Sequence, residues 1–157
     1  MRPSLIGATW ERWTRIGTPI STATEPKLNL YDKGWPIWTY QAQLPPAKFV
    51  HNQDERRGMA IESMVSGGCI VSGRVFRSVL FSSVRVHSHA VVNWSVLLPE
   101  VQVGRGVRLT RTVVDRGCTI PDGLVIGEDP AVDGARFHRS ANGICLVTAE
   151  MLAKIHA

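Results

Sequence analysis

The central part of the sequence repeats itself at a regular spacing of 17 along the chain. Three similar eight-residue segments begin at Val79, Val96 and Val113. Two columns of apolar residues continue the same period: Ala90, Val107 and Leu124; Val92, Leu109 and Ile126. A fixed internal period of this kind indicates a solenoid, in which each copy forms one coil and stacks on the next.

Within each copy, apolar residues recur about every six residues, as Val86, Val92 and Leu98 show, and turn-forming residues often follow them, as in Ile120-Pro121. A period of six is neither the helical period nor a strand alternation. It is typical of the hexapeptide repeat, in which each unit gives one short strand and one corner and three units close a coil. The abundant valines suit such strands because β-branched side chains pack well on pleated surfaces.

We therefore predict an all-β fold, a single-stranded parallel β-helix over residues 64–128. A looser first copy is expected at a spacing of 16, which would place Met64, Ile70 and Phe76 in the columns of Leu80, Val86 and Val92. A β-sandwich would need turn signals roughly every 8 to 12 residues and would not explain the columns of the longer period. The spacing does not determine the handedness of the coil.

The flanking segments differ in character from the repeats. Residues 1–26 lack periodicity and are expected to be poorly ordered, whereas residues 27–63 form an extended connector in which Trp35, Trp38 and Tyr40 are more simply packing residues than a platform for sugars. Residues 129–157 are expected to form a loop over 129–142 and a short helix over 148–155. Thr148 is the candidate N-cap of this helix, which would cover the open end of the β-helix.

The composition restricts the class of protein. No segment reaches the roughly 20 apolar residues of a membrane-spanning helix, so we expect a cytoplasmic protein without a membrane partner. The net charge is +5, and arginine, which suits discrete contacts with phosphate or carboxylate, is the more abundant basic residue. Nucleic-acid binding is not expected because aromatic and basic residues do not alternate. Three cysteines without a CxxC pair favour reduced thiols.

Several motifs outside the generic repeat carry a family resemblance. They are Asn29-Leu30-Tyr31-Asp32, Trp35-Pro36-Ile37-Trp38-Thr39-Tyr40, Leu44-Pro45-Pro46-Ala47-Lys48-Phe49-Val50, Val65-Ser66-Gly67-Gly68-Cys69-Ile70, Val96-Leu97-Leu98-Pro99-Glu100-Val101, Val114-Asp115-Arg116-Gly117-Cys118, Ile120-Pro121-Asp122-Gly123 and Val125-Ile126-Gly127-Glu128. Over residues 27–155 the chain resembles the C-terminal regulatory half of bacterial ADP-glucose pyrophosphorylase, also called glucose-1-phosphate adenylyltransferase.

The resemblance implies a left-handed β-helix and a role in regulation and oligomerisation. In this family an N-terminal domain uses magnesium to make ADP-glucose from ATP and glucose 1-phosphate for glycogen synthesis. The enzyme is a homotetramer. No segment here resembles that catalytic domain, and residues before Lys27 do not resemble the family. We therefore expect a truncated chain without catalytic residues, metal or cofactor of its own. Its expected partners are further copies, a catalytic subunit of the family or a sugar-phosphate effector.

The resemblance also suggests one site residue, since Arg116 matches an arginine of the family's effector pocket. Arg105, Arg108, Arg111 and Arg116 fall within one coil length, so we expect them to share an edge and form an anion-binding strip, with a solvated charged face as the simpler alternative. Ala149 and Ala153 stand where relatives carry arginines, which departs from the effector pattern.

An alternative function is a trimeric hexapeptide acyltransferase. Its general base would be His87 or His89, which alternate along the chain and would project to the same side of a strand. Two histidines do not make a three-ligand zinc site, and a corner or surface role is the simpler interpretation. Cys118 occupies the column of Val84 and Val101, so it is expected to be a small core residue rather than a reactive thiol.

Overall fold

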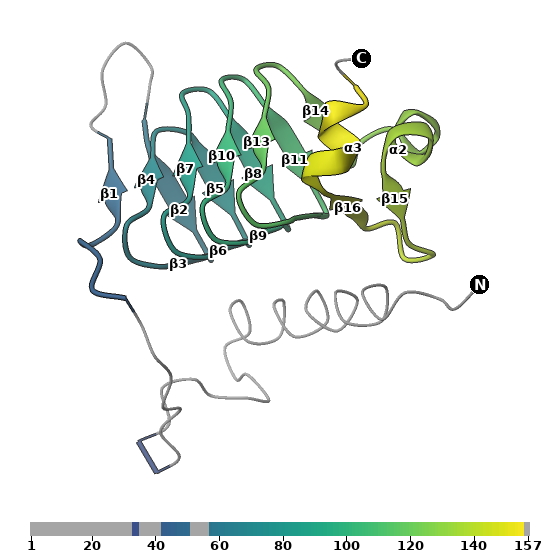
Figure 1. The fold of residues 1–157 in the computed structure, drawn as a ribbon. Coiled ribbons are helices and arrows are strands. Elements are labelled where there is room, and N and C mark those ends of the chain that lie inside the picture. The colour runs from purple at the N-terminus through teal and green to yellow at the C-terminus, as the bar shows by residue number, and fades with distance from the viewer. Residues whose placement is uncertain (1–32, 35–41, 51–56, 156–157) are drawn as a thin grey trace.

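The computed structural model describes residues 33–34, 42–50 and 57–155. Figure 1 shows that most of this part of the chain winds into stacked coils whose strands lie in rows. Its strands form three sheets, and all pairings except one are parallel. The prediction of an all-β parallel β-helix is therefore confirmed. Residues 1–26, Trp35, Trp38 and Tyr40 lie outside the described residues.

Each coil contributes one short strand to each of the three sheets. The first sheet contains, in spatial order, β1 (Lys48–Phe49), β4 (Ile70–Val71), β7 (Arg85–Val86), β10 (Gln102–Val103) and β13 (Thr119–Ile120). The second contains β2 (Met59–Ile61), β5 (Arg74–Phe76), β8 (Val91–Asn93), β11 (Arg108–Thr110) and β14 (Val125–Ile126). The third contains β3 (Met64–Val65), β6 (Val79–Leu80), β9 (Val96–Leu97), β12 (Thr112–Val114), β16 (Cys145–Val147) and β15 (His138–Arg139).

The period found in the sequence is the register between neighbouring coils. Arg85 pairs with Gln102 and Gln102 with Thr119, each pair at a spacing of 17. The backbone N–H of Arg85 donates to the carbonyl of Val101 over 2.9 Å, and the N–H of Gln102 donates to Cys118 over the same distance. Each coil therefore satisfies the backbone groups of the next, as buried peptide groups require.

Inward side chains of successive coils stack into continuous columns that form the core. Those that are 0% or 1% exposed include Val71, Val86, Val103 and Ile120 of the first sheet, Val75, Val92, Leu109 and Ile126 of the second, and Leu80, Leu97 and Val114 of the third. The predicted columns of Val92, Leu109 and Ile126, and of Val84, Val101 and Cys118, are thus buried as expected.

The predicted spacing of 16 for the first copy is wrong. Val65 pairs with Leu80 and Val71 with Val86 at a spacing of 15, whereas Val75 pairs with Val92 at a spacing of 17. The inward residues of this coil are therefore these three valines. Met64, Ile70 and Phe76 stand one position away and are only partly buried, because a shift of one residue along a strand moves its side chain to the opposite face.

The β-helix is longer than the predicted 64–128 at both ends. Strands β1 and β2 lie within the predicted connector and pair with β4 and β5. Lys48 pairs with Ile70 at a spacing of 22, so a search for the regular period does not find this coil. At the other end, Cys145 pairs with Thr112 at a spacing of 33, after a long excursion of the chain.

The C-terminal excursion contains a helix that the sequence analysis missed. Residues 129–142 were expected to be a loop, but α2 (Pro130–Arg136) lies within them. Asp129 caps this helix by accepting from the N–H groups of Ala131 and Val132, and proline occupies its first position, where the lost N–H costs no hydrogen bond. This combination of Asp and Pro was the available signal.

The predicted final helix is confirmed as α3 (Ala149–Ala153). Its N-cap is Thr148, whose hydroxyl accepts from the N–H of Met151. Leu152 and Phe137 are 5% and 4% exposed and belong to the core, and Figure 1 places α2 and α3 at the C-terminal end of the coils. This end of the β-helix is therefore closed by apolar packing.

A buried carboxylate fixes α2 to the last coil. Asp133 is 2% exposed and its Oδ2 accepts from the N–H of Gly127 over 2.8 Å. Gly127 has a φ of 92°, and a Cβ at this position would overlap the carbonyl oxygen of Thr110. Glycine is required here both for the backbone conformation and for the close approach of the two chain segments.

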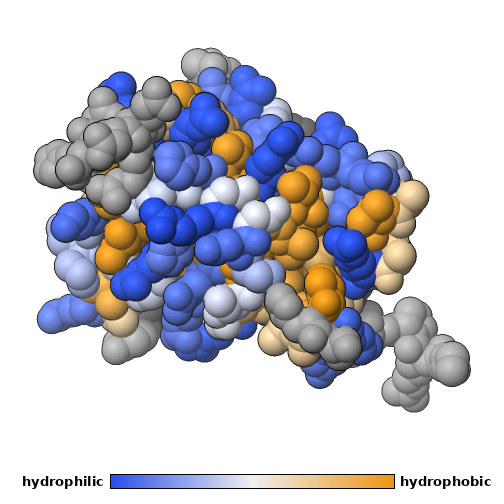
Figure 2. Space-filling view, turned by 90° about the horizontal axis from the view of Figure 1, so that it is seen from above, coloured by the Kyte–Doolittle hydropathy of each residue, from blue (hydrophilic) through white to orange (hydrophobic). Residues whose placement is uncertain are grey.

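The outer surface is chemically mixed. The face in Figure 2 is mostly hydrophilic, with hydrophobic residues in separate groups. Among the described residues, the large hydrophobic side chains that remain exposed are Leu44, Phe49, Ile61, Trp94, Val125 and Val132. Single exposed apolar residues are common on protein surfaces. Only exposed apolar residues that lie close together indicate a binding surface.

Adjacent leucines in β9 and after it provide a test of the inward register. Leu97 is 0% exposed, whereas Leu98 lies at the surface side and is partly buried. Leu97→Ala should lower the free energy of unfolding by about 2–5 kcal/mol because it opens a cavity in the core. Leu98→Ala is the matched control and should cost less than about half as much. Urea denaturation followed by circular dichroism measures both, and equal losses would contradict the register.

Candidate functional site

The three predicted anion-binding arginines lie on different sides of the coil. Arg108 is in β11 of the second sheet, Arg111 follows that strand at the corner leading to the third sheet, and Arg116 is in the turn between β12 and β13. Arg105 lies at yet another corner, between β10 and β11. The expectation that these arginines share one edge is wrong, because a step of about six along the chain leads to the next corner, whereas the same edge of the next coil lies at a spacing of 17.

Arg116 stands at an exposed turn and forms an ion pair with Glu100. Its Nη2 donates to Glu100 Oε1 over 2.8 Å, and the two side chains are 68% and 57% exposed. The hydrogen bond to Glu100, together with the charge of this carboxylate, raises the pKa of the Arg116 guanidinium. Such an exposed pair contributes little to stability, so Arg116 is available to exchange Glu100 for another anion.

The Arg116 turn also lies beside the beginning of α3. The N–H of the preceding residue, Asp115, donates to the carbonyl of Val147 over 2.9 Å, and Val147 is followed directly by the N-cap Thr148. Ala149 and Ala153 of α3 are exposed. The position of Arg116 and the positions of these alanines therefore belong to the same end of the molecule, although they are far apart in the sequence.

Arg108 and Arg111 are in different surroundings. Arg108 pairs with Glu128, with 2.7 Å between Nη2 and Oε1, on the outer side of the second sheet. Arg111 is exposed and has a left-handed backbone, with a φ of 50°. Neither forms a common anion site with Arg116. Both are therefore suitable control positions for Arg116 rather than further ligands of the same anion.

The two histidines of the alternative function occupy a corner. His87 follows β7 and is partly buried, and His89 is exposed with a φ of 63°. They do not belong to one strand, so the expectation that both side chains project to the same side of a strand is wrong. Within the described residues, no group of three or more His, Cys, Asp or Glu side chains could hold a metal ion.

All three cysteines are buried in the β-helix. Cys69, Cys118 and Cys145 are at most 1% exposed and are free thiols. Burial raises the pKa of each thiol, and the charge of Asp133 adds to the effect at Cys145. Because the thiolate is the nucleophile, these groups are poorly placed for covalent chemistry, in agreement with the predicted core role of Cys118.

The corner between the second and third sheets carries a hydroxyl ladder that sequence reasoning missed. Ser63, Ser78, Ser95 and Thr112 occupy equivalent positions in four coils. Each hydroxyl of the first three accepts from the backbone N–H of the next member over 3.0–3.1 Å, and every hydroxyl also donates to a carbonyl two positions before it. The recurrence of Ser or Thr at spacings of 15 and 17 was the available signal.

Comparison with known proteins assigns the fold to a family. The model of the GlmU-like C-terminal hexapeptide family matches residues 45–147, which include every strand from β1 to β16. The chain belongs to this family. The match begins before β1 and ends at the last residue of β16, so the family comparison and the strand pairing agree on the extent of the β-helix.

Curated relatives are similar over nearly the whole chain. A glucose-1-phosphate adenylyltransferase of Paramagnetospirillum magneticum is 53% identical over 161 residues, covering 96% of this chain and 37% of the relative. That of Dechloromonas aromatica is 58% identical over 150 residues, covering 95% and 33%. That of Albidiferax ferrireducens is 61% identical over 132 residues, covering 83% and 31%. The chain thus spans about a third of the length of these relatives, matching their C-terminal part.

These alignments correct one expectation about the N-terminal segment. Residues 1–26 are about a sixth of the chain, so an alignment that covers 96% of it cannot leave them all out. The similarity therefore reaches into the segment that we set apart from the family. In the part of the chain that the structure describes, no helix is long and apolar enough to span a membrane.

The raised thiol pKa values give a test of cysteine burial. In the native protein at pH 8, all three cysteines should react with a disulfide reagent such as DTNB at least about 100-fold more slowly than in guanidinium chloride, because the buried thiols stay protonated and inaccessible. Mass spectrometry of the labelled peptides identifies each site. Rapid native labelling of Cys118 would contradict its place in the core column.

Proposed function

We propose that this chain is a regulatory and oligomerisation module of the glucose-1-phosphate adenylyltransferase type and that it does not catalyse the reaction by itself. The observation that carries the proposal is the identity of 53–58% to these enzymes over 95–96% of the chain, in an alignment that covers only 33–37% of each enzyme. In the part of the chain that the structure describes, the buried thiols and the dispersed arginines also form no constellation suited to nucleotidyl transfer.

Self-association is supported by the asymmetry of the two ends of the β-helix. The last coil is covered by α2 and α3, whereas Phe49 in the first coil is 40% exposed although it occupies the inward column of Val71 and Val86. Leu44, just before β1, is 37% exposed. Apolar groups at the end of a solenoid stack favour contact with another coil or domain. A second copy or a catalytic domain would supply it.

Effector binding is proposed for Arg116. It lies beside the beginning of α3, its charge is maintained at all ordinary pH values, and its partner Glu100 is exposed and exchangeable. A sugar phosphate could replace Glu100 through charge-assisted hydrogen bonds to the guanidinium. Arg108 and Arg111 were predicted for the same role, but they lie elsewhere on the coil and do not converge on this site. A cytoplasmic location and the absence of a cofactor remain predictions.

The acyltransferase alternative is not favoured. His87 and His89 lie at a turn rather than side by side on a strand, and the relatives found are adenylyltransferases. A general base must be oriented toward the substrate hydroxyl from which it takes a proton. The relatives, which are adenylyltransferases, give no support for such a role of His87 or His89.

The proposed regulatory role can be tested by reconstitution. The purified chain alone should form no ADP-glucose from ATP, glucose 1-phosphate and magnesium. Mixed with a catalytic-domain fragment of a relative, it should change the rate and add a response to sugar phosphates. Arg116→Ala should weaken effector binding by at least about tenfold, because it deletes a charge-assisted contact. Arg108→Ala, which breaks a similar exposed ion pair, should retain it. Activity of the chain alone, or no effect in the mixture, would refute the proposal.

The open first coil can be tested separately by sedimentation. Phe49→Ser should shift the chain toward smaller species, because it removes apolar area from the exposed end. Val125→Ser is the matched control, since Val125 is 39% exposed but lies on the outer side of the second sheet. Circular dichroism should show that both variants remain folded. Equal oligomeric states for Phe49→Ser and the unmodified chain would exclude this end as the contact.

A further inference from the structure

The corner between the second and third sheets has an unusual set of left-handed residues. Glu62, Arg77, Trp94 and Arg111 occupy it in four successive coils, with φ values of 45–50°. At the other two corners, glycine takes some of the equivalent positions: Gly68 and Gly117 at one, Gly106 and Gly123 at the other. A bulky residue in this conformation costs free energy that glycine avoids. Large side chains thus take all four of these positions, whereas the other two corners mix glycine with Ser83, His89 and Glu100.

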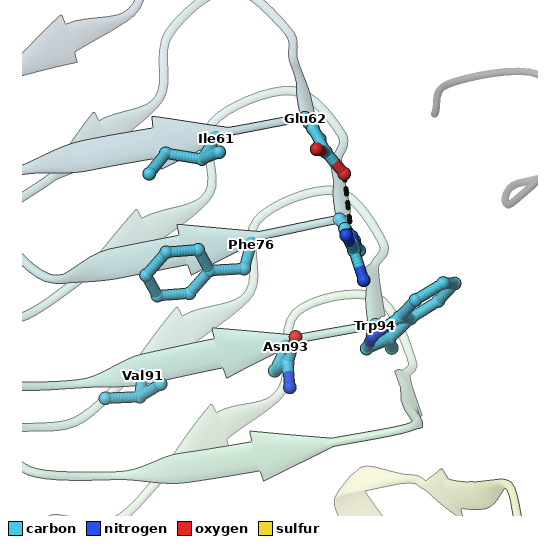
Figure 3. A pocket seen from close by; sticks show the side chains of 7 residues that line it. Ile61, Glu62, Phe76, Val91, Asn93 and Trp94 are labelled. Carbon is cyan, nitrogen blue, oxygen red and sulfur yellow. Dashed lines mark hydrogen bonds and ion pairs between the residues drawn. The ribbon is translucent and has the colours of Figure 1, made fainter. Parts of the chain in front are cut away.

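Three of these side chains form an ordered stack. Glu62 Oε2 accepts from Arg77 Nε over 2.7 Å, and the guanidinium carbon of Arg77 lies 5.1 Å from the centre of the Trp94 ring. Figure 3 shows Trp94 projecting from the corner, with the ion pair in line above it. The coil spacing sets this alignment, and the contact between cation and ring holds the indole in place. Trp94 is nevertheless 38% exposed.

A hollow of about 370 Å³ adjoins this stack. Its apolar part comes from the outward side chains of the second sheet, namely Ile61, Phe76 and Val91, and Asn93 adds an amide. In Figure 3 the side chains of Ile61 and Phe76 extend over the strands, whereas those of Glu62 and Trp94 rise from the corner. The lining combines an apolar floor, an aromatic ring and a few polar groups, which is the usual composition of a small-molecule site.

The charges around the hollow favour an uncharged ligand. Its two charged lining residues, Glu62 and Arg77, neutralise each other, so a phosphate or carboxylate would have to break their ion pair. The Asn93 side-chain amide and Glu62 Oε1 make no hydrogen bond within the described part of the chain. They can therefore donate to and accept from hydroxyl groups.

We propose that this corner binds a neutral sugar ring of an oligosaccharide, a role distinct from the proposed effector site at Arg116. A sugar ring presents an apolar face of C–H groups, which suits the indole and the floor of the hollow, and a rim of hydroxyls, which suits Asn93 and Glu62. The binding groups are held by the coil framework and by the Glu62–Arg77–Trp94 stack, so little side-chain entropy is lost on binding. The site is open at the surface, which allows a longer saccharide to extend beyond it.

This proposal can be tested by saturation-transfer NMR on the full chain, with maltoheptaose and cellohexaose as probes. The method is suitable because it also works with a self-associating protein. We expect binding with a dissociation constant on the order of 1 mM for at least one of them. Trp94→Asn should weaken it by about tenfold, since an aromatic contact is lost. Asparagine tolerates the left-handed backbone, so this variant should fold. The matched control is Arg111→Asn, which has the same backbone conformation in the next coil but lies outside the hollow.

Each result distinguishes the proposal from its competitors. Binding that Trp94→Asn weakens and Arg111→Asn preserves supports the sugar site. Binding to neither saccharide at concentrations about tenfold above the expected constant overturns it, as does binding that both variants retain. A stronger signal from glucose 6-phosphate than from the neutral probes also overturns it, because the site would then recognise the anion. A change of oligomeric state in Trp94→Asn without saccharide binding would overturn it too and would assign the corner to a protein contact instead.

Discussion

The structure depends on the register between neighbouring coils. Residues at a spacing of 17 pair along all three sheets, so that each coil supplies hydrogen-bond partners for the next and continues the same columns of aliphatic side chains. Backbone pairing and core packing therefore impose one spacing, and a shift of one residue would reverse the side chains of an entire strand. The hydroxyl ladder of Ser78, Ser95 and Thr112 extends this register through a corner, where strand pairing alone would leave N–H groups without acceptors.

The same register determines which surface groups can act together. Neighbours in the sequence separate around the coil, as Arg108, Arg111 and Arg116 do, whereas groups one coil apart come into line. Glu62, Arg77 and Trp94 therefore form an ordered stack, although each belongs to a different coil and none is near another in the sequence. A solenoid of this kind favours sites that run along an edge over sites drawn from one short segment, because its contacts are between adjacent repeats.

The two ends of the solenoid differ in how completely their apolar residues are covered. Phe137 and Leu152 close the C-terminal end, and the buried carboxylate of Asp133 fixes the cap to Gly127. Phe49 leaves part of the N-terminal end exposed. A chain that covers about a third of its adenylyltransferase relatives and presents one apolar end suits a module that works through association. Regulation at Arg116 and saccharide binding at Trp94 would then occupy separate surfaces of this module.

The sequence by itself determined the β-helix, most of its inward columns, the burial of Cys118 and the final helix, since all of these follow from local patterns or from a fixed period. The strand at Lys48 and the last strand, β16, were missed because their spacings of 22 and 33 interrupt that period. The helix after Asp129 was missed although Asp129 and Pro130 mark its start. Only the tertiary structure decided which outward residues meet. The dispersal of the arginines and the stacking of Arg77 on Trp94 follow from the winding of the coil, which converts distance along the chain into position around an axis.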